Sequence, residues 1–186
     1  MDILGVKPET WFPIITLVLG IFLKGINDLI FDARKAKREK EARLELRLDT
    51  LNLRKIEFQR ASLLDLQAAM QKLARATGKG HYDDLMAFQE SGEWGKNSLS
   101  EEANEGAFQA QTSLLALRVR VDDSEIRELA DAFSFTCNHI TLCKDKQSAE
   151  ACFLRLQVYL QELNDKIGAA LRRLDTLEDA AVHRPG

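Results

Sequence analysis

Proline and glycine are scarce in this chain, with 3 prolines and 10 glycines among 186 residues. Strand-rich folds need frequent tight turns, and these two residues are prominent in such turns. No glycine or proline lies between Gly25 and Gly78, so residues 26–77 are expected to form one long helix. The scarcity of turn residues therefore argues against a strand-rich fold and predicts an all-α protein.

Cysteine is also rare, and the three cysteines, Cys137, Cys143 and Cys152, all lie in the last third of the chain. An odd number of cysteines on helical patterns indicates reduced thiols in a cytosolic compartment. His139 and Cys143 lie four residues apart and Cys152 follows a short turn, so the three could bind a metal. No Cys-x-x-Cys pair accompanies them, and Cys137 and Cys152 lie on apolar stripes. Buried thiols are therefore favoured, and we expect neither a metal nor a cofactor.

Motifs of the common enzyme classes are missing from the sequence. It contains no P-loop, no Gly-x-Ser-x-Gly and no dinucleotide fingerprint. Arg75 and His81 are spaced as in the arginine-histidine motif of HEPN ribonucleases, which they resemble; the resemblance implies a histidine base and a phosphate-binding arginine. Here the spacing straddles Gly78 and Gly80, and Ala76 replaces the usual polar residue. We expect no catalytic residues, with an HEPN-like ribonuclease as second alternative.

Charge is distributed unevenly along the chain. Residues 1–60 carry 12 Lys and Arg against 9 Asp and Glu, whereas residues 61–186 carry 14 against 20. An acidic C-terminal part does not resemble a general nucleic-acid binder, so no double-stranded nucleic acid is expected as a partner. The segment RKAKREKEAR, residues 34–43, concentrates six basic residues and is expected to contact anionic headgroups.

The N-terminal region holds the longest apolar run, and we predict that residues 11–31 form a transmembrane helix. Its 21 residues would span about 31 Å, although the uncharged part, Thr10 to Leu23, covers only about 21 Å. The expected membrane anchors are two aromatic and four basic residues: Trp11, Phe12, Arg34, Lys35, Lys37 and Arg38. The positive-inside rule then predicts an inner-membrane protein with an external N-terminus, residues 1–10, and a cytoplasmic bundle. An interfacial helix and a buried soluble helix are the alternatives.

Small and polar residues form a stripe within this predicted helix. At 3.6 residues per turn, Thr16, Gly20, Lys24 and Asn27 share one face, and Asp28 can pair with Lys24. Such a stripe predicts that copies pack together or that the residues line an aqueous path. The alternative is that Lys24 snorkels to the headgroups, with Asn27 and Asp28 already in the interface.

The remainder of the chain predicts a charged stalk helix, residues 32–52, and an antiparallel four-helix bundle, residues 53–179, with a frayed tail, residues 180–186. Leu63, Leu66, Met70 and Leu73 keep the spacing of a buried helix face.

The first helix is expected to end at Thr77, because Gly78 and Gly80 follow. Residues 78–98 then form a loop, with a short helical turn around Asp84–Glu90 as an option. Its residues His81, Tyr82 and Trp94 are the expected ligand or partner site. Three further helices are predicted, which begin at Ser98 or Ser100, at Asp122 and at Asp145–Ser148. Capping boxes mark the start of two of them: Ser98 with Glu101, and Asp122 with Glu125.

The chain resembles uncharacterised bacterial single-pass membrane proteins in three features. They are the apolar N-terminal segment, the basic segment RKAKREKEAR and the segment RVRVDDSEIRELADAF, residues 118–133. The layout is also similar to small membrane effectors of phage-defence operons, which implies a sensing domain coupled to a pore. We therefore expect a non-enzymatic, membrane-anchored protein that self-associates. Its cytoplasmic bundle is expected to bind a protein or small molecule and to couple this binding to a pore-forming or membrane-perturbing span. The expected partners also include membrane lipids. A passive tether or scaffold for a cytoplasmic complex is the first alternative.

Overall fold

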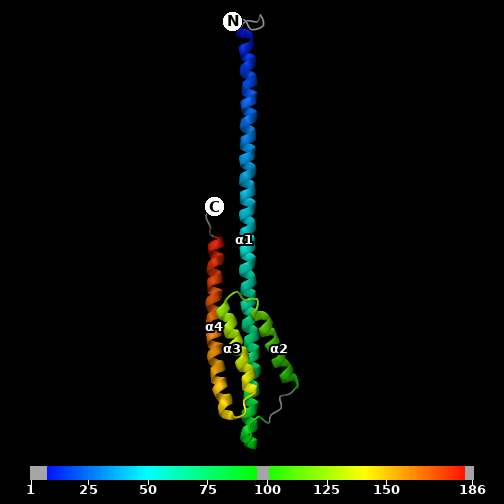
Figure 1. The fold of residues 1–186 in the computed structure, drawn as a ribbon, viewed down its shortest axis with the longest axis vertical. Coiled ribbons are helices and arrows are strands. Elements are labelled where there is room, and N and C mark those ends of the chain that lie inside the picture. The colour runs from blue at the N-terminus through cyan, green and yellow to red at the C-terminus, as the bar shows by residue number, and fades with distance from the viewer. Residues whose placement is uncertain (1–7, 96–100, 183–186) are drawn as a thin grey trace. The chain divides into compact units, whose positions relative to one another are not determined.

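The structure, a computed structural model, describes residues 8–95 and 101–182, without the side chains of residues 8–15, 26, 28–30, 33 and 182. The described residues contain four α-helices and no strand, which confirms the all-α prediction. They are α1 (Pro8–Ser91), α2 (Glu101–Arg118), α3 (Ser124–Thr141) and α4 (Lys146–Val182). The chain divides into two compact units, residues 1–51 and 52–186, so α1 contributes to both (Figure 1).

The second unit is a bundle in which the C-terminal part of α1 packs with α2, α3 and α4 (Figure 1). The predicted face of α1 is confirmed, because Leu63, Leu66, Met70 and Leu73 are all buried. Phe133 of α3 and Leu163 of α4 are completely buried in the same core. Burying such side chains stabilises the fold by roughly 1.5–3 kcal/mol each, so this apolar core holds the bundle together.

Polar contacts join the helices around this core. Gln67 of α1 donates a hydrogen bond of 2.8 Å to the side-chain oxygen of Asn164 on α4. Arg60 of α1 pairs with Asp175 and Glu178 near the end of α4. Because these partners are more than 95 residues apart in sequence, the contacts fix which faces of α1 and α4 meet.

The end of α1 differs from the prediction. The helix continues through Gly78 and Gly80 to Ser91, so the predicted loop over residues 78–98 is wrong as far as Ser91. Each glycine weakens a helix by about 1 kcal/mol relative to alanine, a cost that tertiary packing can offset. Here the lost propensity is offset by packing: Gly80 and His81 are buried, and Gly78 faces the Phe153 ring of α4. The turn begins instead at Gly92, whose φ of 72° suits glycine.

The helix starts are close to those predicted. The third helix begins at Ser124, two residues after the predicted start at Asp122, and its N-cap is Asp123, not Asp122. Asp145 accepts hydrogen bonds from the backbone and the hydroxyl of Ser148, as an N-cap does. The Ser98 half of the predicted capping box lies outside the described residues, as do residues 1–7 and the end of the predicted tail.

The transmembrane prediction requires a correction. Helix α1 does run through residues 11–31, but no helix among the described residues contains an apolar stretch of the length that a membrane span requires. The uncharged stretch is several residues too short, and Lys24, Asn27 and Asp28 interrupt its continuation. The predicted transmembrane helix, the single-pass membrane architecture and the inner-membrane location with an external N-terminus are therefore wrong.

Candidate functional site

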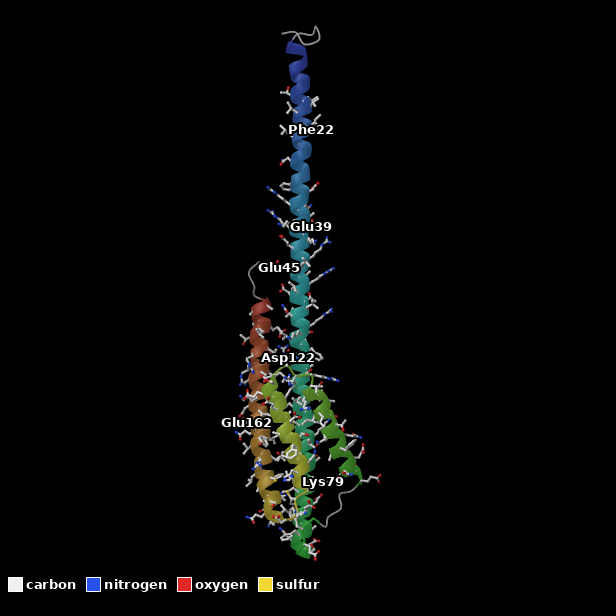
Figure 2. All side chains as sticks on the ribbon, in the orientation of Figure 1. Phe22, Glu39, Glu45, Lys79, Asp122 and Glu162 are labelled. Atoms are coloured by element: carbon white, nitrogen blue, oxygen red, sulfur yellow. The ribbon has the colours of Figure 1, made fainter. Side chains whose placement is uncertain are left out.

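The described part of the N-terminal unit belongs to α1, and its large apolar side chains, where described, are exposed (Figure 2). Six of the seven residues from position 17 to 23 are large and apolar, and each exposes more than half of its surface: Leu17, Val18, Leu19, Ile21, Phe22 and Leu23. Consecutive helical residues are 100° apart, so these side chains surround the helix. An isolated copy therefore leaves apolar surface in water on every side of this segment.

The residues of the predicted polar stripe lie in the same unit. Thr16, Gly20, Lys24 and Asn27 are exposed, whereas the side chain of Asp28 lies outside the described ones. The predicted anchors Arg34, Lys35, Lys37 and Arg38 are exposed, and those of Trp11 and Phe12 fall outside the described side chains. Lys37 pairs with Glu41 at 3.9 Å, but such exposed pairs contribute little to stability.

Leucines at positions 44, 48 and 51 form a second exposed patch in this unit. Their spacing of four and then three residues places them on one face of α1. The same spacing occurs in helices that pack against a partner helix. The patch is therefore a candidate contact surface.

In the bundle, His81 and Trp94 come together but Tyr82 does not join them. The His81 ring is buried and stacks on Phe153 with a centroid distance of 4.6 Å, while Trp94 lies 6.0 Å away. Tyr82 is exposed. Sequence reasoning missed Phe153, because its apolar position on α4 looks like any other core position.

The Trp94 side chain links the turn after α1 to the turn after α3. Its Nε1–H donates a hydrogen bond of 3.1 Å to the carbonyl oxygen of Cys143, and its ring meets Phe88 edge-on. Lys146 lies over Phe88, 5.6 Å from the ring centroid, in cation–π range. Since Trp94 is committed to these internal contacts, its role is to anchor the turn.

Burial governs the protonation of His81. Desolvation lowers the pKa of His81 below its ordinary value, and the nearby carboxylates of Asp84 and Glu150 oppose this shift. The Nδ1 atom is buried without a hydrogen-bond partner among the described groups. Because a charged imidazole is disfavoured there, the ring is neutral near pH 7.

Arg75 and His81 do not form a shared site. Six residues of helix separate them by about 240° around the axis. Arg75 is exposed and its Nε–H lies 3.4 Å from the Gln71 carbonyl oxygen, whereas His81 is buried against Phe153. This separation gives no support to the ribonuclease alternative.

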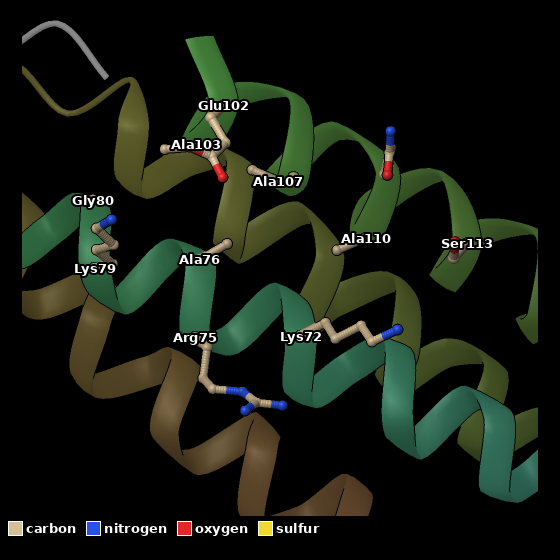
Figure 3. A pocket seen from close by; sticks show the side chains of 12 residues that line it. Lys72, Arg75, Ala76, Lys79, Gly80, Glu102, Ala103, Ala107, Ala110 and Ser113 are labelled. Carbon is tan, nitrogen blue, oxygen red and sulfur yellow. The ribbon is translucent and has the colours of Figure 1, made fainter. Parts of the chain in front are cut away.

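An open groove lies between α1 and α2, with a volume of about 610 Å³ (Figure 3). Alanine and glycine line much of it, including Ala76 and Gly80 of α1 and Gly106 of α2. Three cationic residues of α1, Lys72, Arg75 and Lys79, also line it, with Glu102 of α2 as the acidic member. Sequence reasoning missed the groove because it ended the helix at Thr77. The sequence feature that could have indicated the groove is the spacing of these cations, which lie three and four residues apart.

His139, Cys143 and Cys152 form the remaining cluster of reactive side chains. Their ligating atoms lie within 4.8 Å of one another. Cys137 lies apart in the core, where burial raises the pKa of its thiol to about 11. Burial also raises the pKa of Cys143, and the neighbouring Cys152 adds to the shift.

No protein-family model, curated protein or solved structure matches this chain. The resemblance to single-pass membrane proteins and to phage-defence effectors therefore receives no support from relatives, and the site residues must be interpreted from their own chemistry.

Proposed function

We propose that this chain is a non-enzymatic helical scaffold, in which the N-terminal unit of α1 joins several copies and the bundle binds a partner. The observation that carries the proposal is the exposure of Leu17, Val18, Leu19, Ile21, Phe22 and Leu23 around the whole helix. A helix that is apolar on all sides is normally enclosed by other elements. Further copies of the same helix supply such an enclosure without any additional component.

The distribution of these side chains bears on the number of copies. One partner helix covers a single stripe, which leaves the opposite apolar side chains in water. Three or more helices are needed to shield a segment that is apolar on every side. The scaffold proposed here is therefore a trimer or a higher assembly, and the patch of Leu44, Leu48 and Leu51 supports association along the same unit.

Light scattering of the full-length chain in aqueous buffer tests self-association. We expect one closed oligomer, and we expect Leu19→Glu combined with Phe22→Glu to lower its mass, because charges in an apolar contact are strongly disfavoured. Ala36→Glu, at an exposed position among the basic residues, is the control and should keep the mass of the wild type. A monomeric wild type at the highest soluble concentration would reject the proposal.

For the bundle, the groove between α1 and α2 is the best-supported place for a partner. Its small residues permit close approach of another backbone, and Lys72, Arg75 and Lys79 favour a negatively charged segment. We propose an acidic peptide as the ligand class. Fluorescence anisotropy with a labelled glutamate-rich peptide tests it. Lys72→Glu with Lys79→Glu should abolish binding, whereas Lys144→Glu, outside the groove, should retain it; equal binding by all variants would reject the groove.

A further inference from the structure

The cluster of His139, Cys143 and Cys152 joins the end of α3 to the start of α4. His139 lies in the last turn of α3, Cys143 in the connecting turn and Cys152 in the second turn of α4. The two sulfur atoms are 4.0 Å apart, and the three ligating atoms lie within 4.8 Å of one another. The cluster therefore combines two thiols and an imidazole at nearly the separations of a single coordination sphere.

The sulfur separation matches a shared metal better than a disulfide. A disulfide bond is about 2.05 Å long. Two thiolates on one tetrahedral zinc ion, each about 2.3 Å from the metal, lie about 3.8 Å apart. All three cysteines of the chain are free. A change of a few tenths of an ångström would therefore bring Cys143 and Cys152 to the zinc-binding separation.

The backbone around the cluster is held in place by hydrogen bonds. The Cys143 N–H donates to the Ile140 carbonyl oxygen at 3.3 Å, and the Cys143 carbonyl oxygen accepts from Trp94. Cys152 lies within helix α4 and packs against the hydrophobic core. Both thiols are therefore positioned by elements that exist before any ion binds, which reduces the entropic cost of forming a site.

The imidazole is the adjustable member of the cluster. His139 is exposed and its ring stacks on Phe135 of the preceding turn, with a centroid distance of 6.0 Å. An exposed ring can change rotamer at little cost. The ring can therefore reorient toward the two thiols without disturbing the core.

We propose that His139, Cys143 and Cys152 bind one Zn²⁺ ion, with water as the fourth ligand. Two thiolates and a neutral imidazole balance the charge of a divalent ion, and nitrogen and sulfur are the donors that zinc prefers. Binding releases the two thiol protons to solvent. Asp145 does not supply the fourth ligand, because both of its carboxylate oxygens accept hydrogen bonds from Ser148.

Cobalt substitution tests the site in the full-length, reduced chain. Co²⁺ added to metal-free protein should produce thiolate-to-cobalt charge transfer and the intense visible bands of tetrahedral cobalt, saturating at one equivalent. Zn²⁺ should then displace it. Cys143→Ser and Cys152→Ser should each remove at least half of the charge-transfer intensity, and His139→Asn should weaken cobalt binding at least tenfold.

Cys137→Ala is the matched control, because it also removes one cysteine but leaves the cluster intact. It should retain the full cobalt spectrum, with circular dichroism used to verify that each variant is helical. Thermal unfolding gives a second measurement: Zn²⁺ should raise the Tm of the wild type but not that of the double Cys143→Ser, Cys152→Ser variant. A reduced wild type without thiolate–cobalt absorbance, or with equal absorbance in the double variant, would overturn the proposal.

Discussion

Gln59 and Arg120 are joined by a hydrogen bond of 2.9 Å, from the side-chain Nε2 of Gln59 to the carbonyl oxygen of Arg120. The other end of the same amide, Oε1, accepts from the backbone N–H of Asp122 at 3.0 Å. One buried side chain on α1 thus satisfies a donor and an acceptor in the turn between α2 and α3. The Gln59 amide therefore helps to hold this turn against α1, in addition to the hydrogen bonds within the turn itself.

Replacing this amide should destabilise the bundle. Gln59→Leu keeps a similar volume but leaves the Arg120 carbonyl and the Asp122 N–H without their side-chain partner, which costs about 1–3 kcal/mol. Urea denaturation should show this loss, and hydrogen exchange of the Asp122 amide should accelerate. Gln89→Leu, at an exposed position of α1, is the control and should change stability by less than about 0.5 kcal/mol. Equal effects of the two substitutions would contradict the role assigned to Gln59.

The burial of His81 predicts that acid weakens the fold. Because the pKa of His81 is lowered in the folded state, the unfolded chain binds a proton more readily as the pH falls through the ordinary value of 6.5. The free energy of unfolding should therefore be greatest above that pH and decline below it, until the pH passes the lowered pKa.

A histidine variant isolates this contribution. His81→Phe preserves a ring against Phe153 and removes the titrating group, so the decline between pH 7 and pH 5 should be smaller. Chemical denaturation of the wild type and of His81→Phe at a series of pH values measures this difference. An unaltered acid dependence in His81→Phe would show that other groups cause it.

Adjacent aspartates provide a test of the helix cap. The Asp123 carboxylate accepts from the backbone N–H groups of Glu125 and Ile126 and also pairs with Arg173. Asp122 makes an exposed ion pair with Lys55 at 3.2 Å. Asp123→Ala should cost about 1 kcal/mol and Asp122→Ala less than about 0.5 kcal/mol, by thermal or urea unfolding. A larger loss of stability in Asp122→Ala than in Asp123→Ala would show that Asp122 is the N-cap, as the sequence pattern predicts.

Two glycines near the end of α1 should respond to alanine in opposite ways. A Cβ at Gly78 would lie 3.9 Å from the Phe153 ring, an ordinary contact, so Gly78→Ala should stabilise the helix by about 0.5–1 kcal/mol. At Gly92 the positive φ disfavours any Cβ, so Gly92→Ala should destabilise by about 1–2 kcal/mol. Unfolding free energies decide the signs. A destabilising Gly78→Ala would show that this segment packs more tightly than the contact distance indicates.

The failure of the transmembrane prediction has a particular cause in the residues. The prediction needs the apolar run from Trp11 to continue past Lys24, Asn27 and Asp28 to reach the length of a span. Hydrophobicity by itself reports that a segment avoids water and does not identify what covers it. The exposure of these apolar side chains is the observation on which the proposed association of copies rests.

Local patterns in the sequence are enough to predict that this protein is helical and which face of α1 enters the core. The absence of glycine and proline from residues 26–77 removes local stop signals, and the spacing of Leu63, Leu66, Met70 and Leu73 leaves one apolar face to bury. These features act over one or two turns, so they can be detected without knowing the fold. Tertiary structure decided that α1 continues to Ser91, since the packing of His81 and Gly78 against Phe153 overrides the local preference to stop. It also decided the groove between α1 and α2, because a surface formed by two helices depends on how they pack and not on the pattern within either one.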